Sequence, residues 1–159
     1  MIFGIFTENM RVVIQRVSRA SVTIDGVLKS GIGNGMMVLL GIEDADNQED
    51  AEYLCQKMTK LRIFGDENGA MNLDINQAGG DFLVVSQFTL HAMTKKGNRP
   101  SFIRAARPEK AVPLYEFFLK RLAEVSGRKV ESGEFGADMQ VELVNDGPVS
   151  ILMDTKRRE

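Results

Sequence analysis

Val-Val-Ser-Gln-Phe-Thr-Leu occupies positions Val84 to Leu90, and the rest of the chain can be arranged around this stretch. It combines β-branched and aromatic residues, as strands do, and it ends in hydroxyl and amide side chains. We predict a strand over Asp81 to Thr89 that presents Ser86, Gln87 and Thr89 near its end. Taken alone, the pattern also fits a strand with ordinary Ser and Thr hydrogen bonds.

Patterns on both sides of this stretch predict further strands and two helices. Helical spacing of apolar residues predicts one helix over Asp46 to Leu61, and a proline before and a glycine after a second apolar stripe predict another from Pro108 to Gly127. The strand-like runs, separated by turn residues, are Arg11 to Val17, Ser21 to Ile24, Met36 to Ile42, Lys129 to Glu131, Val141 to Val144 and Val149 to Met153. Strands grouped around two helices favour an α+β domain, with an antiparallel sheet curled toward a barrel, over a parallel βαβ fold.

The composition limits the domain organisation. A chain of 159 residues with 43% hydrophobic residues is long enough for one domain with a core and short for two. We expect a single domain over residues 10–159. Residues 1–9 are expected to be an extension, disordered or due to an upstream start site, because the strand pattern begins at Met10. A single Cys and the lack of a run near about 20 apolar residues predict a cytoplasmic protein without membrane spans.

A second informative stretch is Asn-Asp-Gly-Pro-Val-Ser, from Asn145 to Ser150, in which Gly147 directly precedes Pro148. Glycine permits unusual backbone dihedral angles, and an X-Pro bond is the one kind with an appreciable cis population. The residues alone favour an ordinary trans-proline turn over a backbone-lined pocket, because most X-Pro bonds in folded proteins are trans.

Charge is unevenly distributed along the chain. The net charge of -2 argues against broad, non-specific attraction to nucleic acid. Between Lys95 and Lys110, however, six basic residues accompany one acidic residue, Glu109, which gives a local net charge of +5. This segment is either a solvated loop or a patch that contacts phosphates. The candidate phosphate contacts are Lys95, Lys96, Arg99 and Arg104.

Several familiar catalytic designs are missing. With one histidine, His91, and one cysteine, the chain cannot assemble a Cys or His zinc cluster, and it has no Gly-x-Ser-x-Gly motif. Glycine fingerprints for nucleotides are missing as well. We therefore expect no metal and no cofactor. A hydrolase that uses Thr89 as nucleophile and His91 as base remains an alternative, although a threonine hydroxyl needs an activating base and none is evident beside it.

Together with the segment from Lys95 to Phe102, the two informative stretches resemble the D-aminoacyl-tRNA deacylase family, also called D-tyrosyl-tRNA(Tyr) deacylases. The resemblance runs from Met10 to about Asp154. It implies a homodimeric editing hydrolase that cleaves the ester of D-aminoacyl-tRNA, and also glycyl-tRNA mischarged on tRNA(Ala), with its active site at the subunit interface. It further implies a cis Gly147-Pro148 peptide whose carbonyl oxygens enter the partner's site and reject L-amino acids. The resemblance also implies that the 2'-hydroxyl of the terminal adenosine of tRNA assists the hydrolysis.

The resemblance also assigns roles to residues. Ser86, Gln87 and Thr89 line the catalytic pocket and supply hydrogen-bond donors. Phe88 lies either on the opposite face or against the terminal adenine, and Phe102 either stacks on that adenine or is an ordinary core residue. The residues that support the Gly147-Pro148 loop are Gln15, Arg16, Asn145, Val149 and Ser150. Ser150 stands where the family usually has Thr, a change that keeps the hydroxyl. The alternative function is a tRNA-binding module without hydrolytic activity, suggested by the basic segment and the shortage of catalytic groups.

Overall fold

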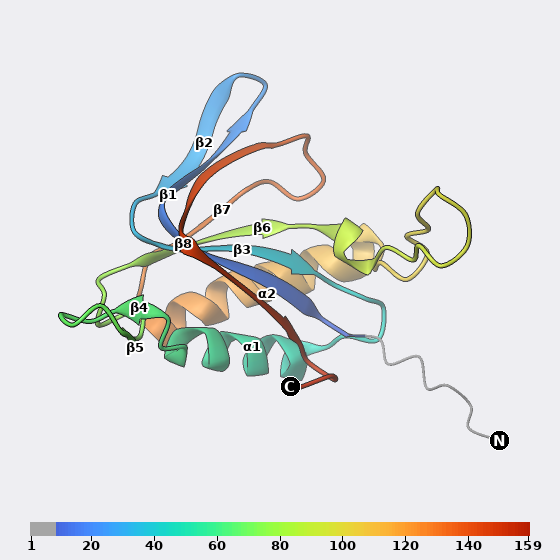
Figure 1. Cartoon of the computed structure of the whole chain (residues 1–159). Helices are drawn as coiled ribbons and strands as arrows, with labels where there is room; N and C mark the ends of the chain where they lie inside the picture. Colours follow the sequence, from blue (N-terminus) through green and yellow to red (C-terminus); the bar gives the residue numbers. More distant parts are fainter. Residues whose placement is uncertain (1–8) are drawn as a thin grey trace.

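The computed structural model describes residues 9–159, and Figure 1 shows a curled sheet with two helices against one face. The main sheet has the strand order β2-β1-β3-β6-β7, and β8 pairs with β1 outside this path. The strands of this sheet are β1 (Arg11–Ile24), β2 (Val27–Ile32), β3 (Gly35–Gly41), β6 (Asp81–Ser86), β7 (Val130–Ser132) and β8 (Gln140–Asp154). Ser30 Oγ of β2 donates to the carbonyl of Ser132 in β7 over 2.7 Å, so the two ends of the path approach each other and the sheet nearly closes into a barrel.

The predicted α+β class and the curled sheet are confirmed, but the sheet is mixed. β3 and β6 run parallel, as do β6 and β7, whereas β1 pairs antiparallel with β2, β3 and β8. The parallel pairs arise because a helix lies between the two strands of each pair and returns the chain to the same edge of the sheet. These helices are α1 (Gln48–Lys60) and α2 (Pro108–Ser126). Strand β2 was not predicted, because its residues, Val-Leu-Lys-Ser-Gly-Ile, show no regular alternation of apolar and polar side chains.

Two pairs of predicted strands are continuous in the structure. The runs Arg11 to Val17 and Ser21 to Ile24 form the single strand β1, and the last two runs form β8. β1 pairs with β8 along most of its length, but the register shifts where Gln15 faces Ser150 and Val17 faces Asn145. The segment between Asn145 and Ser150 therefore bulges away from β1, opposite Arg16.

Both predicted helices are present, with ends within two residues of the predicted bounds. The side chain of Asn47 caps α1 and accepts hydrogen bonds from the amides of Glu49 and Asp50. Pro108 opens α2, and Gly127 closes it in the left-handed conformation, with φ of 67°. Neither helix in the described part of the chain is long and apolar enough to cross a membrane.

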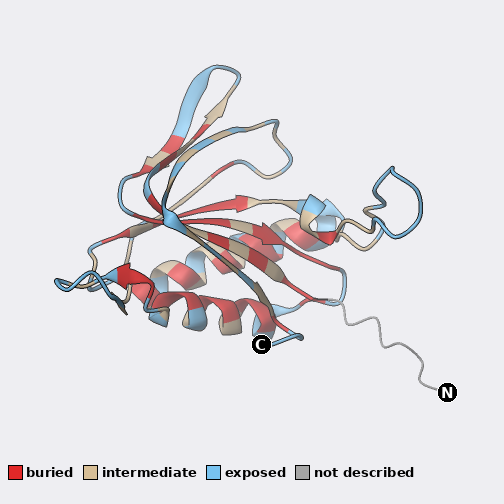
Figure 2. Ribbon diagram, in the orientation of Figure 1, coloured by how far each residue is buried: buried red, intermediate tan, exposed pale blue. Residues whose placement is uncertain are grey.

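The core has two parts, one on each face of the sheet. The larger part lies between the sheet and the two helices, where Leu54 and Met58 of α1 and Phe118 of α2 are fully buried. The smaller part lies inside the curl and includes Val22, Leu83 and Val85. Figure 2 shows the buried residues along the middle of the sheet and on both helices. A small hairpin of β4 (Phe64–Gly65) and β5 (Met71–Leu73) stands apart.

The expected N-terminal extension lies almost wholly outside the described residues, which begin at Asn9. Asn9 itself is buried, and its amide donates to Glu43 Oε2 over 3.0 Å. The folded domain therefore includes Asn9.

Candidate active site

The polar stretch lies where the central strand β6 gives way to a short 3-10 helix, η1 (Phe88–His91). The predicted strand through Thr89 is wrong by three residues, because β6 ends at Ser86. The Gln87 amide still donates to the Leu40 carbonyl over 2.8 Å, and the chain then turns, with the Leu90 amide donating to the Gln87 carbonyl over 3.3 Å. As a result, Phe88 and Thr89 are exposed at the edge of the sheet.

Gln87 and Thr89 form a hydrogen-bonded pair in this turn. The side-chain amide of Gln87 donates to Thr89 Oγ1, and Ser86 lies next to it, half-buried at the end of β6. The three predicted catalytic side chains are thus brought together. Such a group can donate hydrogen bonds to an ester and orient it, but it contains no strong base.

His91 faces away from this group. Its side chain is 0% exposed, and its Nδ1 lies 2.7 Å from Glu43 Oε1. Burial lowers the pKa of His91. A buried imidazole directed at Glu43 cannot take a proton from exposed Thr89, which argues against the Thr89 and His91 alternative.

A mainly apolar cavity of about 270 Å³ opens beside Ser86 and Gln87. Its walls come from the ends of β3 and β6 and from the loop that precedes β8. They comprise Leu40, Ile42, Val85, Ser86, Gln87, Phe88, Phe135, Gly136, Ala137, Met139 and Val141. The part that residues 135–139 play in the cavity wall was not predicted. The glycines around Phe135 indicate a loop, but they do not show against which strands the loop packs.

Two aromatic rings mark one side of this region. Phe88 is 56% exposed, and its ring meets that of Phe102 edge to face, with centroids 5.1 Å apart. Phe102 is half-buried. The structure therefore joins the two aromatic residues that the sequence analysis assigned to the same ligand.

The Gly147-Pro148 bulge is held by its neighbours. Its peptide bond is cis, and both residues are exposed. Arg16 Nε donates to the Asp146 carbonyl over 3.0 Å, and Arg16 Nη1 donates to the Ile63 carbonyl over 2.7 Å. Gly147 has φ of +130°, and a Cβ there would lie 2.9 Å from Arg16 Nη2, so only glycine fits.

Side-chain hydrogen bonds close the base of the bulge. Asn145 Oδ1 accepts from the Val149 amide over 3.1 Å, and Asn145 Nδ2 donates to Ser150 Oγ over 3.1 Å. Gln15 Nε2 also reaches Ser150 Oγ, at 3.4 Å. All five predicted supporting residues are therefore gathered around the bulge.

Within one chain, the bulge is separate from the turn that holds Ser86, Gln87 and Thr89, the candidate catalytic turn. Ser86 pairs with Leu40, which pairs with Val12 of β1, whereas the bulge lies opposite Arg16. Four residues along a strand span about 13 Å, and the path from β8 through β1 and β3 to β6 crosses three interstrand spacings. The bulge instead shares a polar cavity with Arg16, Asn34 and the β4–β5 hairpin, and none of Ser86, Gln87 or Thr89 lines it.

The predicted phosphate contacts divide into two kinds. Lys95, Lys96 and Arg99 are exposed in a loop that a bridge between Met93 and Ser101 closes. Arg104 is different, because its side chain is only 23% exposed and its Nη2 lies 3.3 Å from Glu43 Oε2. The first three are available to a ligand, whereas Arg104 forms an internal ion pair.

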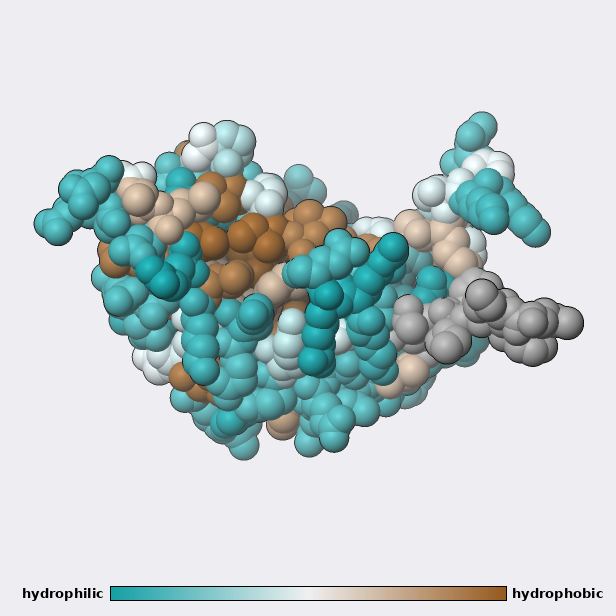
Figure 3. Space-filling view, turned by 60° about the horizontal axis from the view of Figure 1, so that its bottom comes forward, coloured by the Kyte–Doolittle hydropathy of each residue, from teal (hydrophilic) through white to brown (hydrophobic). Residues whose placement is uncertain are grey.

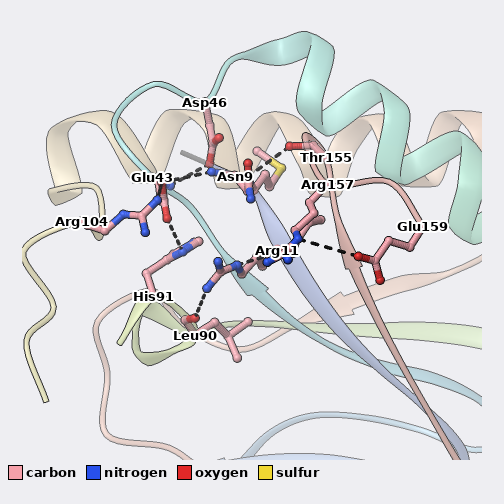
Figure 4. Close-up of polar contacts among 12 residues, drawn as sticks. Asn9, Arg11, Glu43, Asp46, Leu90, His91, Arg104, Thr155, Arg157 and Glu159 are labelled. Carbon is pink, nitrogen blue, oxygen red and sulfur yellow. Dashed lines mark hydrogen bonds and ion pairs between the residues drawn. The ribbon is translucent and has the colours of Figure 1, made fainter. Parts of the chain in front are cut away.

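Glu43 is the centre of a buried polar cluster that the sequence analysis did not identify (Figure 4). Its amide donates to Asp46 Oδ2 over 2.7 Å, and both side chains are buried. Burial raises the pKa of Asp46 to about 7. No group of three or more His, Cys, Asp or Glu side chains within residues 9–159 is arranged to hold a metal ion.

Comparisons with known proteins identify the family. The model of the D-Tyr-tRNA(Tyr) deacylase family matches residues 13–154. A D-aminoacyl-tRNA deacylase of Bacteroides thetaiotaomicron is 62% identical over 150 residues, and one of Phocaeicola vulgatus is 63% identical over 150 residues. Each alignment covers 94% of this chain and 100% of the relative.

Two solved structures share the fold. One is described as the c-Myc DNA Unwinding Element Binding Protein; it has a TM-score of 0.85 and 42% identity and covers 91% of this chain and 97% of its own. A probable eukaryotic D-amino acid tRNA deacylase has a TM-score of 0.78 at 18% identity, over 92% of this chain and 99% of its own, which supports the fold alone. With a family match across most of its length and close relatives aligned end to end, the chain belongs to the D-Tyr-tRNA(Tyr) deacylase family.

Proposed function

We propose that this protein hydrolyses the ester that joins a D-amino acid to the 3' end of tRNA and leaves L-aminoacyl-tRNA intact. The reaction class comes from the family, whose named relatives are D-aminoacyl-tRNA deacylases. The proposal for selectivity between D- and L-amino acids rests on the Gly147-Pro148 bulge. This bulge is exposed, and yet hydrogen bonds with Arg16 and Asn145 hold it in place. An exposed backbone held so firmly is suited to meet a ligand rather than to fill a core.

In this proposal, main-chain atoms distinguish D- from L-configured amino acids in the substrate. The carbonyl oxygens of Gly147 and Pro148 accept hydrogen bonds from the substrate ammonium and crowd one direction at its α-carbon. A D side chain points away from them, whereas an L side chain collides. Rejection by collision discriminates more strongly than attraction in a pocket. Glycine has no side chain to collide, so glycyl-tRNA, including tRNA(Ala) mischarged with glycine, is also a substrate.

Hydrolysis then needs orientation more than a strong nucleophile, because the ester of an amino acid with a ribose hydroxyl is already activated. Ser86, Gln87 and Thr89 hold the ester and donate to its carbonyl oxygen while water attacks with help from the neighbouring 2'-hydroxyl. The apolar cavity beside Ser86 takes the terminal adenine, with Phe88 and Phe102 at its side. No cofactor or metal takes part in this scheme.

The rest of the tRNA end lies along the basic loop. Lys95, Lys96 and Arg99 are exposed there and contact phosphates in this proposal. The proposed location is the cytoplasm, because aminoacyl-tRNA is the proposed substrate.

A homodimer brings the two parts of the site together. On β8, Leu152 lies four residues beyond Pro148, and its exposed side chain lines a cavity together with Leu90 of η1. We propose a two-fold axis near Leu152, so that the bulge of each subunit lies over the catalytic turn of the other and the same contact is made twice, as in an isologous interface. Leu152 is 75% exposed in the single chain, which agrees with a surface that a partner covers. Figure 3 shows apolar residues gathered across the middle of the face drawn there, between hydrophilic projections.

The test is a stereospecific deacylation assay. Purified protein is incubated separately with D-tyrosyl-tRNA, L-tyrosyl-tRNA and glycyl-tRNA(Ala), and the remaining ester is measured over time. We expect rapid loss of the D ester and the glycyl ester and no acceleration with the L ester. Protection of both tyrosyl esters would favour the tRNA-binding module instead, and equal hydrolysis of both would refute selection by the bulge.

A further inference from the structure

Glu43 joins segments that are far apart in the sequence. Its side chain is 0% exposed, and its Oε1 lies 2.7 Å from Nδ1 of His91. Its Oε2 accepts from the Asn9 amide over 3.0 Å and lies 3.3 Å from Nη2 of Arg104. Figure 4 shows these side chains converging on one carboxylate from separate parts of the chain. A buried carboxylate with such partners has little freedom to move.

The contact with His91 fixes the end of the catalytic turn. His91 is the last residue of η1, two positions after Thr89. The preceding residue is anchored as well, because Arg11 Nη1 donates to the Leu90 carbonyl over 3.0 Å and Arg11 Nε is paired with Asp154 at 2.9 Å. Two successive residues of η1 are thus held from inside the protein, while Phe88 and Thr89 face outward.

The contact with Arg104 fixes the end of the basic segment. Backbone pairing supports it, since Glu43 forms an antiparallel bridge with Ala105 and the Ala106 amide donates to the Ile42 carbonyl over 2.8 Å. The chain between His91 and Arg104, which includes the exposed basic loop and Phe102, is therefore attached to Glu43 at both ends.

We propose that Glu43 is a positioning residue for the deacylation reaction, which acts through His91 on the turn of Gln87 and Thr89 and through Arg104 on the segment that meets RNA. The inference rests on the proposed function, because it assumes that Gln87 and Thr89 face the ester. Groups that bind a substrate need partners behind them to hold their geometry to within about 0.5 Å. A buried ion pair contributes little to stability beyond what an apolar pair of the same size provides, so orientation is the more specific role of this cluster.

The test compares four variants with the wild type. Glu43→Gln keeps the shape and removes the charge, and His91→Ala removes the contact. His91→Asn keeps an N–H near the position of Nδ1 but cannot act as a base. The matched control is Thr59→Val, which removes a different buried hydrogen bond, that of 2.8 Å from Thr59 Oγ1 to the Cys55 carbonyl in α1.

With D-tyrosyl-tRNA, we expect kcat to fall about tenfold in Glu43→Gln and His91→Ala while KM changes less than about twofold, because misplaced groups slow the chemical step. His91→Asn should recover most of kcat, and Thr59→Val should keep it. A loss of kcat of about 100-fold or more in both His91 variants would point to a base and overturn the inference. Unchanged kcat in His91→Ala and Glu43→Gln would overturn it as well.

Amide hydrogen exchange provides a measurement that does not depend on activity. Exchange at residues 87–91 and 101–105 should accelerate together in Glu43→Gln and His91→Ala and stay unchanged in Thr59→Val. Acceleration in only one of the two segments, or in neither, would overturn the inference even if the wild type proved inactive. If His91→Ala fails to fold, His91→Asn and Glu43→Gln supply the same comparison.

Discussion

Replacing Arg16 with lysine tests whether the Gly147-Pro148 bulge must be held in place. One guanidinium donates both to the Asp146 carbonyl, at 3.0 Å, and to the Ile63 carbonyl, at 2.7 Å. A lysine ammonium is a point charge without the rigid fork, so it can keep at most one of these contacts. The variant therefore loosens the bulge without removing the positive charge.

The size of the effect follows from these contacts. A hydrogen bond with a charged partner contributes about 1.5–3 kcal/mol. The Arg16 side chain is only 15% exposed, so solvent replaces little of that loss. A loss of about 2 kcal/mol changes the ratio of ordered to disordered bulge about 30-fold. We expect the rate of D-tyrosyl-tRNA hydrolysis to fall about tenfold and the urea-derived free energy of unfolding to fall by about 2 kcal/mol.

Arg19→Lys is the matched control, because Arg19 lies on the same strand and pairs with Glu142 of β8, but its side chain is 62% exposed. This variant should change the unfolding free energy by less than about 0.5 kcal/mol and leave the rate unaltered. A wild-type rate in Arg16→Lys, or an equal loss in both variants, would refute the idea that Arg16 supports the bulge.

Three further predictions follow from burial and exposure. Burial raises the pKa of Asp46 to about 7, above the 3.8 of the free side chain, so the folded state binds the proton more tightly than the unfolded state. The resulting contribution to the free energy of unfolding is fully present below about pH 4 and is lost as the pH rises to about 7. Asp46→Asn should remove up to about 4 kcal/mol of that pH dependence, measured as the urea-derived free energy of unfolding at a series of pH values. Parallel plots of this free energy against pH for variant and wild type would contradict the prediction. Phe102→Ala should raise KM for D-aminoacyl-tRNA about tenfold with little change in kcat, and an unchanged KM would show that the ring does not meet the RNA end. Leu152→Glu should shift the protein to monomers in sedimentation analysis, whereas Val27→Glu, at a position 68% exposed, should leave dimers intact.

The elements that could be predicted from the sequence are those whose signals are local. Helix α2 begins at a proline and ends at a left-handed glycine, and both residues dictate backbone geometry by themselves. The same is true of α1, which was predicted from apolar residues at helical spacing and which buries Leu54 and Met58 completely. Each of these features depends on residues within a few positions of one another.

Features that depend on distant partners could not be predicted in the same way. A basic residue in a basic run gives no sign that it faces a buried carboxylate 61 positions away, as Arg104 faces Glu43. The direction of β6 relative to β3 depends on how α1 crosses the sheet, and the role of Phe135 in the cavity depends on where its loop folds. The resemblance to the family supplied the Gly147-Pro148 assignment, whereas the residues alone favoured an ordinary turn.

Recognition of the substrate by main-chain oxygens, as proposed above, would determine which esters the enzyme accepts. Gly147 and Pro148 would contact the ammonium and crowd one direction at the α-carbon. The substrate side chain would point away from the bulge, so its size and chemistry would not affect binding there. The same geometry therefore gives strictness toward handedness and breadth toward side chains. Changes of selectivity should then arise at residues that hold the backbone, such as Arg16 and Asn145, more readily than at residues that line the apolar cavity. Assaying D-tyrosyl, D-aspartyl and L-tyrosyl esters with variants of both kinds separates these two sources of specificity.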